Sequence, residues 1–176
     1  NRANGRLRAA FHNGTTWVAH AVDNNAQVGR WTSIALDASN RPYIAYWDKT
    51  NQALKVAYRT ASNTWTLAVV DNTAEVGMHT STVVNAFGAH IAYFDRRNGN
   101  LKYALALYNG TTWSTSRVTV DTENVVGLYP SIKLNSLGQP CISYLDFSNG
   151  DLKLAEFDGV SWNISRVDTD GDVGYY

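Results

Sequence analysis

Short runs of alternating apolar and polar residues follow one another along the chain. In the run 33–36 the side chains of Ile34 and Leu36 fall on one face, and the run 43–46 alternates in the same way. A period of two residues is typical of β-strands, in which successive side chains point to opposite faces. No stretch of about a dozen residues shows the spacing of an amphipathic helix. The pattern therefore predicts an all-β chain of short strands.

Turn sequences separate these runs at regular distances. Asn-Gly and Asp-Gly pairs readily adopt the positive φ angles that tight hairpin turns need. We therefore expect hairpins wherever such a pair stands between two alternating runs. The pairs form two sets, one with Asn98-Gly99 and Asn149-Gly150 and another with Asn13-Gly14, Asn109-Gly110 and Asp158-Gly159.

One unit occurs four times along the chain and dominates the sequence pattern. A Val-Asp step recurs at spacings of 48, 50 and 47 residues, and the glycine of a Val-Gly step follows each Asp six residues later. Periods of about 20–50 residues are typical of solenoids, propellers and arrays. Each unit also carries a lone tryptophan and a Leu-Lys or Leu-Arg pair. The aspartates are Asp23, Asp71, Asp121 and Asp168, the glycines Gly29, Gly77, Gly127 and Gly174, and the tryptophans Trp17, Trp65, Trp113 and Trp162.

The runs and turns place four short antiparallel strands in each complete unit, as in a propeller blade. We expect a single repeat domain over 1–176, with a half blade at 1–29 and blades at about 30–77, 78–127 and 128–176. An open array leaves sheet faces and edges exposed. We therefore expect a homo-oligomer, or the remainder of a longer chain, to close the ring.

The repeated unit resembles that of bacterial β-propeller repeat proteins, including lectin-like propellers. The resemblance rests on the Val-Asp-x4-Val-Gly linker, the Tyr-x-Asp segment, the Leu-Lys pair and the tryptophan, and it covers essentially the whole chain. It implies an all-β, β-propeller-type array of four-stranded antiparallel blades, about 3.5 in this chain. It leaves function open, because propellers host both binding and catalysis. The Asp-box propellers of sialidases match less well, since the Ser-x-Asp-x-Gly-x-x-Trp box is missing.

Charge and composition narrow the classes of partner. The chain has 15 basic and 15 acidic residues, and the only adjacent basic pair is Arg96-Arg97, so we expect no nucleic acid as partner. No apolar run approaches the roughly 18 residues of a membrane span. One cysteine, Cys141, excludes an intrachain disulfide and is interpreted as a packing residue. The chain begins at Asn1 with its one methionine at Met78, and we expect a processed or truncated product, extracellular or secreted.

One face of the array is the predicted binding surface. If the strands of each blade run up and down in order, the second hairpin turns and the linkers between blades share a face. Carboxylates there could accept hydrogen bonds from sugar hydroxyls, and aromatic rings could stack on the C–H patches of sugars. Several weak, equivalent sites give avidity. The candidate ligand-binding residues are Trp31, Asp48, His79, Asp95, Tyr129 and Asp146, with Tyr176 as a fourth aromatic.

We call a set of equivalent positions in the repeats a column. For each of these columns, a structural role is the alternative to ligand binding. An Asp just before a hairpin commonly caps the turn through its own backbone, and a repeated aromatic can pack between blades. We interpret the four constant tryptophans as core. The lysines of the Leu-Lys pairs are expected to face solvent or to pair with neighbouring carboxylates. These lysines are Lys55, Lys102 and Lys153, with Arg8 in the first copy.

The sequence gives little support for a metal or for catalysis. Asp168, Asp170 and Asp172 form an acidic run that could bind Ca²⁺, but the other copies lack it and no bidentate Glu follows. We expect no other cofactor. The four histidines occupy different columns, and no nucleophile–base pair is visible.

We therefore predict a non-enzymatic, carbohydrate-binding module that acts through repeated shallow sites. Two alternatives stay open, a structural or protein-docking scaffold and a fragment of a propeller glycoside hydrolase.

Overall fold

The computed structural model describes residues 5–175, which form fourteen β-strands and no helix. The all-β prediction is confirmed. In the part of the chain that is described, no helix is long and apolar enough to cross a membrane. The strands are β1 (Leu7–His12), β2 (Trp17–Asp23), β3 (Val28–Leu36), β4 (Pro42–Asp48), β5 (Ala53–Ala61), β6 (Thr64–Asp71), β7 (Val76–Asn85), β8 (Gly88–Asp95), β9 (Asn100–Tyr108), β10 (Trp113–Asp121), β11 (Val126–Leu134), β12 (Pro140–Asp146), β13 (Asp151–Phe157) and β14 (Trp162–Asp168).

These strands build one hairpin and three four-stranded antiparallel sheets, each ordered along the chain. We call the hairpin β1–β2 blade 1 and the sheets β3–β6, β7–β10 and β11–β14 blades 2, 3 and 4. Each sheet begins at the valine of the Val-Gly step, two residues before the expected blade boundary. The first strand of a blade therefore starts inside the linker motif itself.

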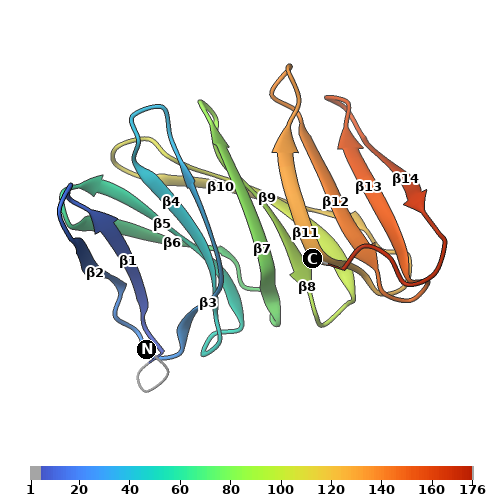
Figure 1. Cartoon of the computed structure of the whole chain (residues 1–176), viewed down its shortest axis with the longest axis horizontal. Coiled ribbons are helices and arrows are strands. Elements are labelled where there is room, and N and C mark those ends of the chain that lie inside the picture. Colours follow the sequence, from blue (N-terminus) through green and yellow to red (C-terminus); the bar gives the residue numbers. More distant parts are fainter. Residues whose placement is uncertain (1–4, 176) are drawn as a thin grey trace.

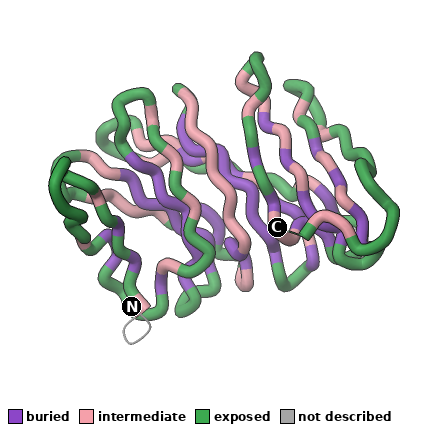
Figure 2. Tube along the Cα trace, viewed as in Figure 1, coloured by how far each residue is buried: buried purple, intermediate pink, exposed green. Residues whose placement is uncertain are grey.

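The blades stand side by side in an arc, from blade 1 at the left of Figure 1 to blade 4 at the right. Their first strands β3, β7 and β11 lie next to one another, with β7 between the other two. The apolar core fills the spaces between blades, and Figure 2 shows buried residues along the middle strands and exposed residues at the turns. Strands β4 and β8 are buried along their whole length because blades cover both of their faces.

Close backbone contact explains the glycine of each Val-Gly step. Gly127 has φ +90°, and a Cβ placed on it would lie 2.5 Å from the Cα of Leu101 in the preceding blade. Only glycine adopts this backbone without strain and leaves room for the neighbour. The ladder is irregular here, with a register shift on each side of Leu128. The repeated glycine thus marks the point where each linker crosses onto the next blade.

The core prediction for the tryptophans holds for three of the four. Trp65, Trp113 and Trp162 are partly buried and pack against the core clusters between blades. The prediction is wrong for Trp17, which is 72% exposed. The reason is its position, since these tryptophans face the preceding blade and the described chain has no blade before β1–β2.

Candidate ligand-binding site

The aspartates of the predicted binding face are buried in hairpin caps. Asp48 is 1% exposed, and its Oδ1 and Oδ2 accept hydrogen bonds from the backbone N and the Nδ2 of Asn51, at 3.1 and 2.8 Å. Asp95 and Asp146 accept the same pair of bonds from Asn98 and Asn149. A direct ligand role for Asp48, Asp95 and Asp146 does not fit this geometry, because the carboxylates are covered and already paired.

The aromatic column forms a row across the first strands. Ring centroids of Trp31 and His79 lie 5.3 Å apart, those of His79 and Tyr129 4.6 Å, and those of Tyr129 and Tyr175 6.0 Å. Trp31 is 39% exposed, while His79 and Tyr129 are half-buried. The fourth predicted member, Tyr176, lies outside the described residues. The rings of the row thus pack against one another from blade to blade, and Trp31 is partly exposed at one end of the row.

All three repeated aromatics adopt a backbone that is rare for their residue types. Trp31, His79 and Tyr129 have φ of +46°, +51° and +49°. A left-handed conformation costs a non-glycine residue about 1–2 kcal/mol. Neighbouring strands hold the row in place, since the Thr80 hydroxyl donates to the Trp31 carbonyl and the Ile132 N–H donates to Ser81 Oγ. Burial lowers the pKa of His79, so its imidazole is neutral at pH 7.

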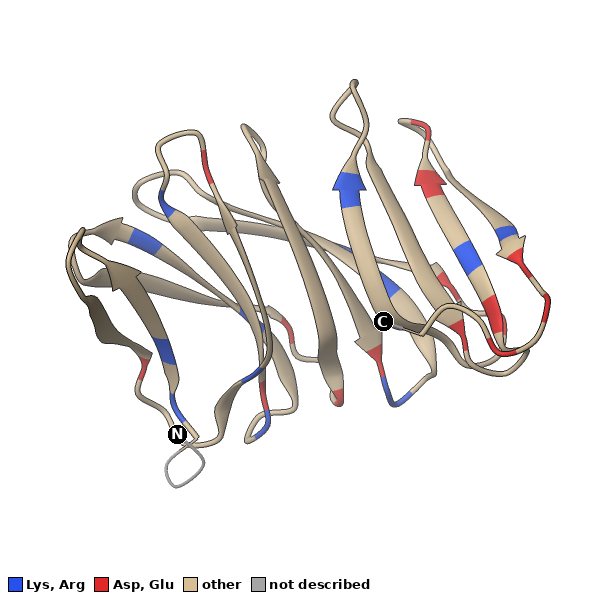
Figure 3. Ribbon diagram, in the orientation of Figure 1, with Lys and Arg blue, Asp and Glu red and all other residues tan. Residues whose placement is uncertain are grey.

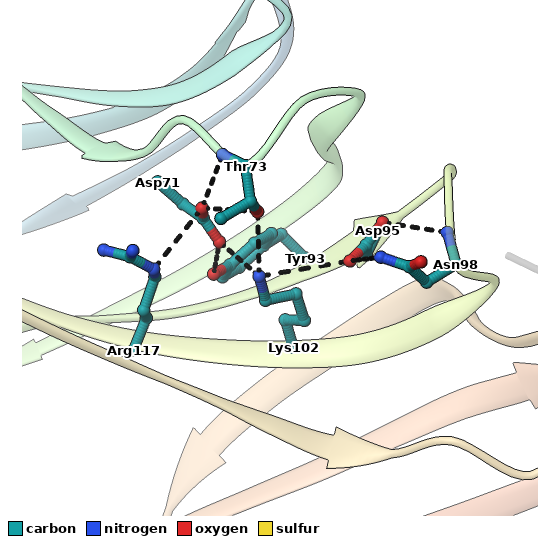
Figure 4. A network of polar contacts seen from close by, with 7 residues as sticks. All are labelled: Asp71, Thr73, Tyr93, Asp95, Asn98, Lys102 and Arg117. Carbon is teal, nitrogen blue, oxygen red and sulfur yellow. Dashed lines mark hydrogen bonds and ion pairs between the residues drawn. The ribbon is translucent and has the colours of Figure 1, made fainter.

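A buried polar triad of Asp, Tyr and Lys, of which the sequence predicted only a pairing of the lysine with a carboxylate, joins each blade to the next. Asp71, at the end of β6, accepts hydrogen bonds from Tyr93 Oη at 2.7 Å and from Lys102 Nζ at 2.5 Å, both in blade 3 (Figure 4). Thr73 and Arg117 complete the shell around the same carboxylate. The two equivalent triads are Asp23–Tyr46–Lys55 and Asp121–Tyr144–Lys153.

Each triad holds its Asp charged and its Tyr protonated. Burial alone would raise the pKa of Asp71, but hydrogen bonds from Lys102, Tyr93 and Thr73 outweigh it and lower that pKa. Burial and the adjacent carboxylate raise the pKa of Tyr93 far above its ordinary value. Of the two expectations for the triad lysines, exposure to solvent is wrong and pairing with a carboxylate is confirmed, with each partner in the preceding blade.

These carboxylates predict a loss of stability in acid. The pKa values of Asp23, Asp71 and Asp121 are all lowered by folding. Their contribution is complete above the unfolded pKa of about 3.9 and disappears as the pH falls through the folded pKa. We expect the free energy of unfolding, measured by urea titration, to fall steeply below about pH 4. The Asp71→Asn variant should show a shallower decline, and equal slopes for the two proteins would contradict this assignment.

A groove lies between blades 2 and 3 on the opposite face from the predicted one. Its two adjoining parts have volumes of about 480 and 510 Å³ and share Arg41, Tyr58 and Tyr108. Arg41 Nε donates to Asp37 Oδ2 at 3.1 Å, and the guanidinium lies 5.2 Å from the centre of the Tyr58 ring. The hydroxyl of Tyr58 donates to the same Asp37 oxygen at 3.0 Å. Polar residues of both blades complete the lining, including Ser39, Thr60, Asn85 and Asn109.

Hydrogen bonds fix the protonation states in this groove. Burial would raise the pKa of Asp37, but donation from the Arg41 and Ser39 amides and from Tyr58 outweighs it, and the pKa is lowered. Burial and the bond to Asp37 raise the pKa of Tyr58 to about 12. The groove therefore presents a charged carboxylate beside a guanidinium whose side chain is 48% exposed.

Comparison with known proteins places the fold. No family model and no curated protein sequence matches the chain significantly. The structure is similar to a fungal lectin of Aleuria aurantia, described as a six-bladed β-propeller with a novel fucose recognition mode, with a TM-score of 0.61 and 16% identity. A mutant of that lectin in complex with Fucα1-6GlcNAc gives a TM-score of 0.59 and 16% identity. These matches cover 98% of this chain but 55% and 56% of the lectin chains, so it spans about half their length.

The chain is an arc of a β-propeller. Its 3.5 blades agree with the sequence prediction, since the described residues form three four-stranded sheets and one two-stranded sheet.

Within the propeller arc, the groove chemistry is confined to one junction. The residues of blade 4 that correspond to Asp37 and Arg41 are Asn135 and Gln139, and blade 3 has a shorter turn there. Leu105 and Glu156 stand where blade 2 has Tyr58. The groove is therefore a single asymmetric site, in contrast to the repeated sites that the sequence predicted. The groove residues Asp37 and Arg41 occur in one repeat only, so the positions shared by all repeats did not predict them.

The acidic run after β14 does not form a cluster. Asp168, Asp170 and Asp172 are exposed, and Asp168 Oδ1 accepts a hydrogen bond from the backbone N of Asp170 at 3.1 Å. Among the described residues, no group of three or more His, Cys, Asp or Glu side chains is placed to hold a metal ion. The geometry of this run therefore lends no support to the Ca²⁺ hypothesis.

Proposed function

We propose that this propeller arc is a non-enzymatic carbohydrate-binding module whose main site is the groove at Arg41. The observation that carries the proposal is the joint presence of Asp37, Arg41 and an aromatic floor in a solvent-open groove. The exposed guanidinium of Arg41, held by Asp37, can donate hydrogen bonds to the hydroxyls of a sugar, and Tyr108, half-buried beside it, offers a ring surface. Two structures of one fungal lectin of similar fold, whose descriptions name fucose recognition and a fucosylated disaccharide, support this class of ligand.

Two features of the groove favour binding over glycoside hydrolysis. Hydrolysis by the usual mechanisms needs two carboxyl groups across the scissile bond, one with a raised pKa. Asp37 is the one carboxylate among the residues that line the groove, and its pKa is lowered. Asp37 instead accepts hydrogen bonds from the Ser39 and Arg41 amides, from Arg41 Nε and from Tyr58 Oη, so its role is to hold Arg41 and Tyr58 in place.

The aromatic row of Trp31, His79 and Tyr129 is the second candidate surface. Its strained backbone is maintained in three blades, and strain often accompanies a functional site. Packing between blades explains the same rings without a ligand. Substitution of Trp31 and Tyr129 distinguishes ligand binding from packing between blades.

Arg41→Ala should weaken binding of the best ligand from a glycan array by about 10- to 100-fold. The expected loss corresponds to about 1.5–3 kcal/mol for hydrogen bonds to a charged group. Binding is measured by isothermal titration calorimetry. Arg96→Ala is the matched control, because Arg96 is an exposed arginine beside a carboxylate, Glu75, and does not line the groove.

Three results would contradict parts of this proposal. If Arg41→Ala binds normally while Trp31→Ala and Tyr129→Ala lose affinity with unchanged stability, the site is the aromatic row. If no glycan binds the chain, the carbohydrate function is wrong. If the array ligand is cleaved on incubation, the non-enzymatic assignment is wrong.

A further inference from the structure

Two hairpin turns of the chain share one sequence, Asn-Gly-Thr-Thr-Trp. This sequence occupies 13–17, between β1 and β2, and 109–113, between β9 and β10. The residue that precedes it differs, and it is His12 in the first turn and Tyr108 in the second. The two turns thus form a matched pair in which the effect of this neighbour on the asparagine can be compared.

The side-chain carbonyl of the asparagine is polarised in both turns. Asn13 Oδ1 accepts hydrogen bonds from the backbone N–H groups of Thr15 and Thr16, at 3.0 and 2.9 Å. Asn109 Oδ1 accepts the same two bonds from its own turn, also at 3.0 and 2.9 Å. Two amide donors on one carbonyl oxygen stabilise the negative charge that develops there when a nucleophile attacks the carbon.

His12 supplies a base to the first turn. The backbone N–H of Gly14 donates to His12 Nδ1 at 3.3 Å, which places an imidazole nitrogen on the amide that follows Asn13. In the second turn Tyr108 takes this place, and its hydroxyl instead donates to the carbonyl of Gly110 at 2.9 Å. The amide that follows the asparagine is therefore hydrogen-bonded to a base in the first turn but not in the second.

We propose that Asn13 is a site of spontaneous deamidation for which His12 is the general base. This reaction is separate from the proposed binding of sugars. His12 Nδ1 takes the proton of the Gly14 amide, and the amide nitrogen forms a bond to Asn13 Cγ. The bond between Cγ and Nδ2 breaks, and ammonia leaves with the proton from the imidazolium. Water then opens the resulting succinimide at either of its two carbonyl groups and leaves aspartate or isoaspartate.

The Asn-Gly pairs at 98–99 and 149–150 provide slow references within the same chain. There the glycine N–H donates to a backbone carbonyl, Asp95 O at 2.9 Å and Asp146 O at 2.8 Å. The Nδ2 of each asparagine also donates to the carboxylate of the same aspartate. A carbonyl oxygen is a much weaker base than the acceptor nitrogen of a neutral imidazole, so we expect both pairs to react more slowly than Asn13.

The test follows these asparagines in one sample of the full chain at neutral pH. Residues 13–16 carry no charge (Figure 3), so either product adds one negative charge and separates from the parent chain in ion-exchange chromatography. Peptide mapping by mass spectrometry then measures the conversion of each asparagine. We expect Asn13 to convert about tenfold faster than Asn109, a smaller effect than in an enclosed active site because His12 is exposed. Equal rates, or a faster rate at Asn109, would overturn the proposal.

Substitution of His12 separates its role as a base from that of a hydrogen-bond acceptor. His12→Tyr gives the first turn the neighbour of the second, and Asn13 should then convert at the rate of Asn109. His12→Gln keeps an acceptor but removes the base, so it should lose the acceleration as well. His20→Gln is the control, since His20 lies in β2 outside the turn, and it should leave the rate unchanged. A fast rate retained in His12→Gln, or an equal loss in His20→Gln, would overturn the assignment of His12, and an unchanged rate at Asn109 verifies that each variant keeps its fold.

Discussion

Lys102→Ala is expected to lower the free energy of unfolding by about 3–5 kcal/mol, the usual cost of removing one partner from a buried ion pair. Lys102 is 6% exposed, and Asp71, its partner in the preceding blade, is fully buried. The substitution leaves a buried carboxylate with Tyr93, Thr73 and Arg117 but without its closest cation. The loss falls on the junction of blades 2 and 3, so both blades should unfold more readily.

Urea denaturation at pH 7 measures this effect, with Lys49→Ala as the control because Lys49 is exposed. Combining Lys102→Ala with Asp71→Asn completes a double-mutant cycle, and we expect a coupling energy of about 1–3 kcal/mol. A loss below about 1 kcal/mol, typical of exposed ion pairs, would mean that the triad contributes little to the junction.

The sequence predicted the sheets well because each strand is encoded within one repeat. Alternation, Asn-Gly turns and the Val-Asp step are local signals, and the strands that they predicted are present. The complete triads escaped prediction, beyond a possible pairing of each lysine with a carboxylate, because each triad draws residues from two repeats. Asp71 closes one unit, while Tyr93 and Lys102 belong to the next, and only the stacking of blades brings them together.

For the predicted binding face, the repeated positions did not reveal which side chains are accessible to a ligand. Repetition placed Asp48 and Trp31 on one face, but it could not tell a capped carboxylate from an accessible one. The Asn that follows each Asp by three residues was the available signal, since it supplies both hydrogen bonds of the cap. The groove was missed for the opposite reason. Asp37 and Arg41 occur in one blade only, so a search for repeated residues passed over them.

Gly127→Ala should destabilise the propeller arc by about 2–5 kcal/mol. A left-handed backbone costs an alanine about 1–2 kcal/mol, and crowding a packed site adds about 1–3 kcal/mol. At Gly127 both apply, because φ is +90° and the new Cβ would lie 2.5 Å from Leu101 Cα and 2.8 Å from its backbone N. Backbone atoms cannot turn aside as a flexible side chain can, so the linker or the whole of blade 4 must shift.

Gly110→Ala separates the two contributions. Gly110 has φ +100°, but nothing lies within 4 Å of the position that its Cβ would take, so only the backbone cost applies. We expect a loss of about 1–2 kcal/mol there in urea denaturation. Equal losses for the two variants would show that contact between the linker and the preceding blade does not constrain the junction. A markedly larger loss at Gly127 would show that the Val-Gly step fixes how closely each blade approaches the next.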